Sequence, residues 1–147
     1  MNRIFAGVTL FCDDIREELT GMNTLVGIYP DNVVVNKMPF AFPKLAFYTR
    51  LTVPTDFEIE PITVNLLAGE EERQLATFTS ELVSLAISQA KADGAEIAGM
   101  ISRTVHAPFP VAAPTRLRIM AKTPNYECQI GNLNIREGSQ SATSPKD

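Results

Sequence analysis

Apolar and polar residues alternate along most of this chain, which is the pattern of a β-strand with one buried face. The clearest example is the segment 44–53, where mostly apolar side chains face one way and mostly polar ones face the other. Residues 3–12 instead carry apolar side chains on both faces, which predicts a strand buried between two layers. Weaker patterns predict further strands over residues 24–29, 33–35, 57–66, 73–78, 97–105, 115–122 and 126–135.

A single segment has helical spacing, which is set by four residues: Leu82, Leu85, Ala86 and Gln89. Thr79 or Ser80 can cap the start of this helix, because a hydroxyl oxygen accepts a hydrogen bond from the first free backbone N–H groups. The pair Asp93-Gly94 predicts its end, since glycine adopts the left-handed conformation of a C-terminal cap. The result is one short connecting helix.

Two proline-rich segments, 37–43 and 106–114, interrupt the strands. Proline cannot donate to a hydrogen-bond ladder, so both segments are expected to be extended connections at an edge. Phe40, Phe42 and Phe109 stand between or beside these prolines. We expect them to be hydrophobic plugs that close one end of the fold, the alternative being an exposed docking patch.

Short strands separated by turns, with one helix as a connection, predict an all-β fold, an antiparallel β-sandwich of about eight strands. A closed barrel is the alternative that the pattern leaves open. The 147 residues suggest one domain, spanning residues 1–137. The segment 138–147 has no apolar anchor and is expected to be a disordered tail.

The formal net charge of −4 gives the chain no overall attraction for nucleic acid. A basic stripe is nevertheless expected on one strand, from Arg116, Arg118 and Lys122, and Lys44 and Arg50 extend it if they share that sheet. Weak nucleic-acid binding is therefore one alternative function, and an ordinary solvent face is the simpler interpretation.

Cofactor and catalytic signatures are absent from the sequence. Cys12 and Cys128 lie in strand-like contexts, and we expect reduced thiols, with a disulfide possible if their strands are neighbours. His106 is the single histidine and is expected at the surface, without a nucleophile motif to serve. These observations favour a protein that is not an enzyme and that needs no cofactor.

Neither a membrane span nor a secretory signal is predicted. No window approaches the roughly 18 apolar residues of a membrane-spanning helix. The first residues are too polar for the apolar region of a secretory signal. We therefore expect a cytoplasmic protein.

The densest charge in the chain lies in one short stretch, formed by Asp13, Asp14, Arg16, Glu17 and Glu18. We interpret it as a solvated turn or hinge between strands, in which Arg16 pairs with a neighbouring carboxylate and Phe11 and Ile15 anchor inward. A partner surface and a site for calcium or magnesium are the alternatives, although the spacing is not that of a calcium-binding loop. A turn is expected to follow at residues 20–23.

A resemblance to a known family rests on three features: the run Phe11-Cys12-Asp13-Asp14-Ile15-Arg16-Glu17-Glu18, Gly21, and the strand Thr24–Tyr29 that ends in Gly-Ile-Tyr. Together they resemble a family of small uncharacterised bacterial and phage-associated proteins. The later Phe42-Pro43-Lys44-Leu45 is similar to the same family, and the likeness covers mainly residues 8–53. Met22 departs from the family pattern, which has lysine there. The resemblance implies a compact β-rich domain of unknown function in a cytoplasmic or phage setting, and brings no assigned catalytic residues.

The sequence as a whole favours a non-enzymatic interaction or structural module whose edges or end loops bind another protein or a second copy. Metal binding through the acidic stretch is the alternative from a different class.

Overall fold

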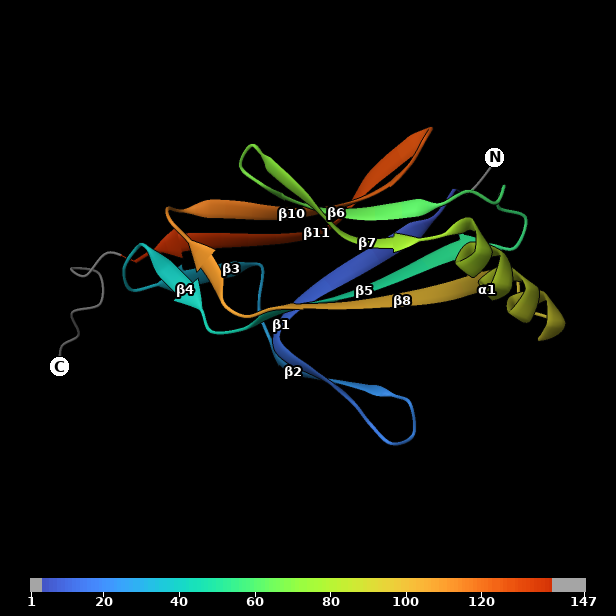
Figure 1. Cartoon of the computed structure of the whole chain (residues 1–147), viewed down its shortest axis with the longest axis horizontal. Coiled ribbons are helices and arrows are strands. Elements are labelled where there is room, and N and C mark those ends of the chain that lie inside the picture. The colour runs from blue at the N-terminus through green and yellow to red at the C-terminus, as the bar shows by residue number, and fades with distance from the viewer. Residues whose placement is uncertain (1–3, 139–147) are drawn as a thin grey trace.

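A computed structural model describes residues 4–138 of the chain and shows two β-sheets packed face to face (Figure 1). Its elements are β1 (Ala6–Glu17), β2 (Asn23–Ile28), β3 (Asn32–Val35), β4 (Phe40–Phe42), β5 (Leu45–Pro54), β6 (Ile62–Ala68), β7 (Glu71–Phe78), α1 (Ser80–Ala92), β8 (Ile97–His106), β9 (Phe109–Val111), β10 (Thr115–Thr123) and β11 (Tyr126–Glu137). Sheet A has the strand order β2-β1-β5-β8, and sheet B has the order β3-β11-β10-β6-β7. Strands β4 and β9 form a separate two-stranded ladder. The predicted tail lies outside the described residues, except for Gly138.

The predicted fold class, all-β with one short helix, is confirmed. Two details differ from the expectation. Within residues 4–138 there are eleven strands, because the proline-rich segments pair with each other as β4 and β9. Strand β3 pairs in parallel with β11, whereas the other neighbouring strands pair antiparallel.

The hydrophobic core lies between the two sheets. Leu51 and Val53 of β5 and Leu117 and Ile119 of β10 are four of its fully buried side chains. Glycine allows the sheets to approach closely, because a Cβ at Gly131 would stand 3.0 Å from side-chain atoms of Thr9 and Ile119. The layers are therefore fixed by small residues as well as large ones.

Strand β1 differs from its prediction, because one of its faces is buried and the other is largely exposed. Thr9 and Phe11 point into the core, where the hydroxyls of Thr9 and Thr49 hydrogen-bond each other at 2.8 Å. On the opposite face Ala6 and Val8 are exposed to solvent. The expectation of a strand buried between two layers is wrong, because nothing in the described chain covers this outer face along its N-terminal half.

The phenylalanines of the proline-rich segments are plugs, as predicted. Phe42 and Phe109 are buried and lie opposite each other in the β4–β9 ladder, and half-buried Phe40 packs edge-to-face on Phe42. This ladder closes the end of the sandwich away from α1 (Figure 1).

The helix begins and ends where the sequence predicts. The Thr79 hydroxyl accepts a hydrogen bond from the N–H of Leu82 at 3.2 Å, and Gly94 follows the C-cap with a φ of 75°. The buried face of α1 is formed by Val83, Ile87 and Ala90. Leu82 and Leu85, which set the helical spacing in the sequence, are exposed.

Candidate functional site

The acidic stretch lies in a β-hairpin that projects from sheet A. Residues Asp13 to Glu17 continue β1 without a break and pair with β2, where Asp14 is opposite Val26 and Arg16 is opposite Thr24. We call residues 13–28 the hairpin. The prediction that the acidic stretch is itself a turn or hinge is wrong, because regular pairing with β2 keeps it extended. The hairpin projects below the body of the sandwich (Figure 1).

The predicted turn lies at the end of this hairpin. The N–H of Glu18 donates to the carbonyl of Met22 at 2.7 Å, and the N–H of Gly21 donates to the carbonyl of Glu18 at 2.8 Å. Gly21 has a φ of 87°, a conformation that side chains other than glycine rarely adopt. The turn is therefore closed by backbone hydrogen bonds and by a residue suited to it.

The carboxylates of the hairpin do not converge, because neighbouring residues of a strand point to opposite faces. Asp13 and Asp14 are consecutive residues of β1. Asp13 accepts a hydrogen bond from the Tyr29 hydroxyl at 2.5 Å, whereas Asp14 lies 3.3 Å from Nζ of Lys44. Among the described residues, no group of three or more His, Cys, Asp or Glu side chains could hold a metal ion.

These contacts change the protonation of the groups involved. A hydrogen bond from the backbone N–H of Ile15, followed by the one from Lys44, lowers the pKa of Asp14. Burial, together with the hydrogen bond to Asp13, raises the pKa of Tyr29 to about 12. Asp14 is therefore a carboxylate and Tyr29 a neutral donor at neutral pH.

A residue from the far edge of sheet A holds the outer part of the hairpin. Nη1 of Arg103, in β8, lies 3.3 Å from Oε1 of Glu17 and donates to Oδ1 of Asn23 at 3.0 Å. Because β8 is separated from β1 by β5, these contacts require the hairpin to bend across the outer face of the sheet. Arg16, expected to pair with a neighbouring carboxylate, makes no ion pair with any residue from 4 to 138.

The tip of the hairpin presents two apolar side chains. Leu19 has a relative exposure of 108% and Met22 of 67%, the two highest values among the large apolar residues described. Sequence reasoning missed both, although a signal was present: two apolar residues flank the turn dipeptide Thr20-Gly21, where polar residues are usual.

The outer face of sheet A continues this apolar character. One row crosses all four strands and reads Ile28, Cys12, Ala46 and Val105. Its two outer members are exposed, Ile28 by 53% and Val105 by 45%, whereas Cys12 and Ala46 are covered by their neighbours. Val8 and Ile101 are exposed on the same face, on either side of Arg50. We call this surface the apolar face.

The predicted basic stripe is present but is partly neutralised. Arg116, Arg118 and Lys122 lie on the outer face of sheet B, where Nζ of Lys122 is 2.8 Å from Oε2 of Glu72. Arg50 belongs to β5 and Lys44 precedes it, so neither extends the stripe, because β5 is in sheet A. The structure therefore separates the basic residues that the sequence grouped.

The thiols and the histidine are dispersed. Cys12 is buried and Cys128 half-buried; both are free thiols, and burial raises the pKa of each. His106 is not the surface residue expected, because it packs edge-to-face against Phe47 and Phe109. Burial, followed by the charge of Arg73, lowers the pKa of His106.

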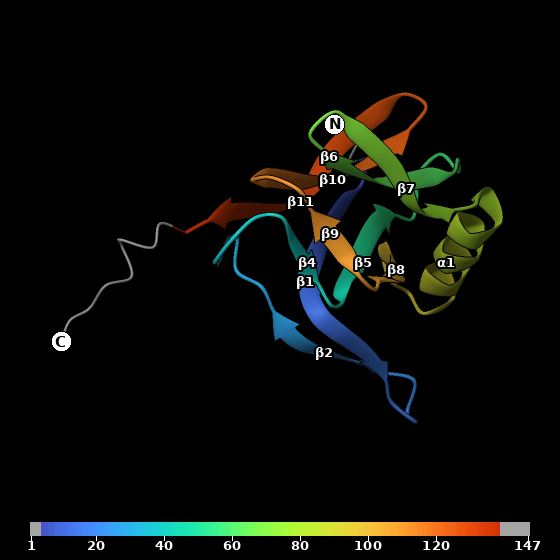
Figure 2. The ribbon, with the colours of Figure 1, turned by 60° about the vertical axis from the view of Figure 1, so that its left-hand side comes forward.

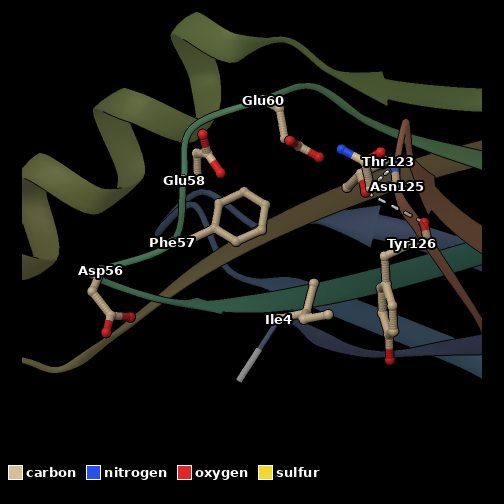
Figure 3. Close-up of a pocket in the computed structure, with 8 residues that line it drawn as sticks. All are labelled: Ile4, Asp56, Phe57, Glu58, Glu60, Thr123, Asn125 and Tyr126. Carbon is tan, nitrogen blue, oxygen red and sulfur yellow. Dashed lines mark hydrogen bonds between the residues drawn. The ribbon is translucent and has the colours of Figure 1, made fainter. Parts of the chain in front are cut away.

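A hollow of about 410 Å³ lies at the end of the sandwich near α1 (Figure 3). Its lining includes Ile4, Phe57 and Tyr126 together with three carboxylates, from Asp56, Glu58 and Glu60. In Figure 3 the Asp56 carboxylate points away from the Phe57 ring, whereas Glu60 extends toward Asn125. The hollow has aromatic walls and negative charge, but its carboxylates do not point to one place.

Within residues 4–138, no helix has both the length and the apolar character needed to cross a membrane. The fold and the hairpin define a two-sheet, all-β protein with an exposed acidic and apolar projection. The chain belongs to a family of unknown function (DUF6941), whose model matches residues 7–121. This match confirms the expected membership of an uncharacterised family and extends well beyond residues 8–53. Comparisons with curated proteins and with solved structures gave no match.

Proposed function

We propose that this protein is a non-enzymatic protein-interaction module of bacterial or phage origin that acts in the cytoplasm. Its binding surface consists of the hairpin and the adjoining apolar face. The observation that carries the proposal is the hairpin tip, where Leu19 and Met22 are exposed on a turn closed by backbone hydrogen bonds. Large exposed apolar side chains on an ordered projection are typical of residues that a partner buries.

The surroundings of the tip support protein binding. The contacts of Arg103 hold the hairpin in place before any partner arrives. Interfaces combine an apolar centre with a polar rim, and here Leu19 and Met22 lie beside the carboxylates of Glu17 and Glu18. Burying both apolar side chains would contribute roughly 1.5–3 kcal/mol each.

The two alternative functions have less support from the geometry. A cation site needs several oxygen ligands around one point, and strand alternation directs Asp13 and Asp14 to different partners. A nucleic-acid surface needs free cations, and Lys122 is paired with Glu72. Protein binding requires only the exposed apolar tip of the hairpin, and no rearrangement of its side chains.

The test is a comparison of two double variants as baits in lysate of the source cell. Leu19→Ser with Met22→Ser removes the apolar tip, and Leu82→Ser with Leu85→Ser removes a second exposed apolar pair, on α1. We expect the tip variant to recover its specific partner about tenfold less than the wild type, as loss of an anchor residue does. The α1 variant should recover it unchanged.

Thermal melting of both variants shows whether the fold is intact. The proposal fails if the set of captured proteins is the same for the wild type and for a folded tip variant. It also fails if the α1 variant loses the same partner.

A further inference from the structure

The edges of the two sheets are protected unequally. In sheet A, α1 packs beside β8 (Figure 2). In sheet B, β7 carries Glu71, Glu72 and Arg73 and is linked to β8 through a 3.5 Å hydrogen bond from the Thr104 hydroxyl to the Leu75 carbonyl. Strand β3 has only four residues. Charge, coverage and short length are the usual means by which proteins prevent an edge from pairing with another strand.

Strand β2 has none of these protections. It has six residues, and the whole segment from Met22 to Pro30 carries no charged side chain. Its far edge pairs with no other strand within residues 4–138. From Asn23 to Val26, alternate backbone N–H and C=O groups therefore point outward, and the φ of 68° at Gly27 interrupts this pattern. Exposed Val26 and Ile28 line the same edge on the apolar face.

Two carboxylates from the neighbouring part of the hairpin reach toward this uncharged edge. Asp13 lies directly over Gly27, since a Cβ at Gly27 would be 2.5 Å from Oδ2 of Asp13. The absence of a side chain on Gly27 leaves that carboxylate open toward the edge. Glu18 accepts a hydrogen bond from the Thr24 hydroxyl at 2.7 Å, which draws its carboxylate to β2.

We propose that the edge of β2 pairs with an extended basic segment of another protein, in which Lys or Arg alternates with apolar residues. Strand addition of this kind gives affinity through backbone hydrogen bonds and specificity through alternate side chains. The apolar residues of such a segment lie beside Val26 and Ile28, and its cations lie on the opposite face beside Asp13. The inference rests on the proposed function and names the partner chemistry of the same surface.

Charge decides between this partner and a second copy. Two-fold antiparallel pairing of β2 with β2 would place the Asp13 carboxylates of both copies, each of which leans over Gly27, on the same face of the joined sheet, and like charges repel. A basic segment reverses the sign of that interaction. The occupant we assign is therefore a foreign basic strand rather than the same chain.

The probe is a fluorescein-labelled heptapeptide with alternating lysine and valine, titrated into the full chain. Two matched peptides serve as controls: one has glutamate in place of every lysine, and one has N-methylated valines that cannot donate backbone hydrogen bonds. We expect the lysine peptide to bind about tenfold or more tightly than either control. We also expect it to shift the amide NMR signals of residues 23–28.

Two protein variants distinguish binding at the edge of β2 from nonspecific electrostatic attraction. Val26→Lys adds a protecting charge to β2, and Val34→Lys makes the same change at an exposed valine of β3. Binding should weaken about tenfold with Val26→Lys and should be unchanged with Val34→Lys. Asp13→Asn should weaken binding similarly and reduce its dependence on salt.

Equal binding of all three peptides, or signals that shift away from β2, overturns the inference. So does a wild-type chain that sediments as a dimer with protected β2 amides, because self-pairing would then occupy the edge. If the peptide does not bind while the tip variant still loses its cellular partner, the edge inference fails and the proposed function stands. If the peptide binds at β2 while capture does not depend on the tip, the proposed function fails instead.

Discussion

The outer faces of the two sheets differ in the side chains that they expose. On sheet B, Asn65 donates to Glu72 at 2.6 Å, Lys122 lies 2.8 Å from the same carboxylate, and Asn134 donates to Asn32 at 3.2 Å. On sheet A, the apolar row from Ile28 to Val105 crosses the whole sheet. An antiparallel sheet with one wet face is expected to be polar there, and sheet B follows that rule.

The difference indicates which of the two outer faces would gain more free energy by contacting a partner. Several polar groups of sheet B, among them Asn65, Glu72 and Lys122, already bond to one another, so a partner would have to displace those contacts. The apolar residues of sheet A gain nothing from water, and burying them releases roughly 25 cal/mol for each Å² covered. The hairpin projects from the same sheet, which places both candidate binding elements on one side.

The largest effect should come from the hydrophobic core that lies between the two sheets. Leu117 is fully buried between the sheets, and Leu117→Ala removes apolar contacts and leaves a cavity. We expect a loss of about 2–5 kcal/mol in the free energy of unfolding, measured by urea denaturation. Val34→Ala, at an exposed position, is the control and should change stability little. A loss equal to the control would mean that the sheets do not pack as described.

A smaller effect should follow from releasing the hairpin. Arg103→Ala removes the contacts to Glu17 and Asn23, and because the ion pair is exposed we expect a loss of only about 0–1 kcal/mol. Amide hydrogen exchange should nevertheless accelerate in residues 13–28 and stay unchanged in sheet B. Arg118→Ala is the matched control on the polar face. An equal acceleration of amide exchange in both sheets would contradict the inference that Arg103 holds the hairpin in place.

The smallest effects should distinguish the two sheets by pH. His106, on the inner side of sheet A, has a lowered pKa. Its contribution to stability is therefore present above pH 6.5 and is lost as the pH falls below that value. The pKa of Glu72, on sheet B, is lowered by Lys122 and then by Asn65, so its contribution is present above pH 4.5 and is lost at lower pH. His106→Phe should remove the first step of a melting-temperature profile and Glu72→Gln the second. A profile unchanged by both would show that neither group is linked to folding.

Local patterns in the sequence predicted the regular elements well. The helix at 80–92 and the strand at 45–54 lie within one residue of their expected positions, because caps and alternation are local signals. The β4–β9 ladder and the parallel pairing of β3 with β11 were not predicted. Both join segments far apart in the chain, and strand alternation carries no information about which strands become neighbours.

The sequence predicted the position of the candidate site but not the contacts that its residues make. Density of charge pointed to residues 13–18, whereas the groups that contact them, Lys44 and Arg103, come from distant parts of the chain. The acidic stretch, expected to be a turn, continues β1 instead, because an exposed strand face accepts charged side chains readily. Leu19 and Met22 flank a turn in the sequence, but the sequence does not show that this turn projects from the sandwich and leaves both side chains exposed.

The Arg103 contacts also bear on how fast and how selectively a partner can associate. A free hairpin would sample many orientations, and a partner would have to restrict them on binding, with a loss of conformational entropy that weakens the complex. Here that restriction is already present in the unbound chain. Docking can then proceed as a nearly rigid-body encounter, in which a surface of the wrong shape is rejected because the hairpin cannot adapt to it.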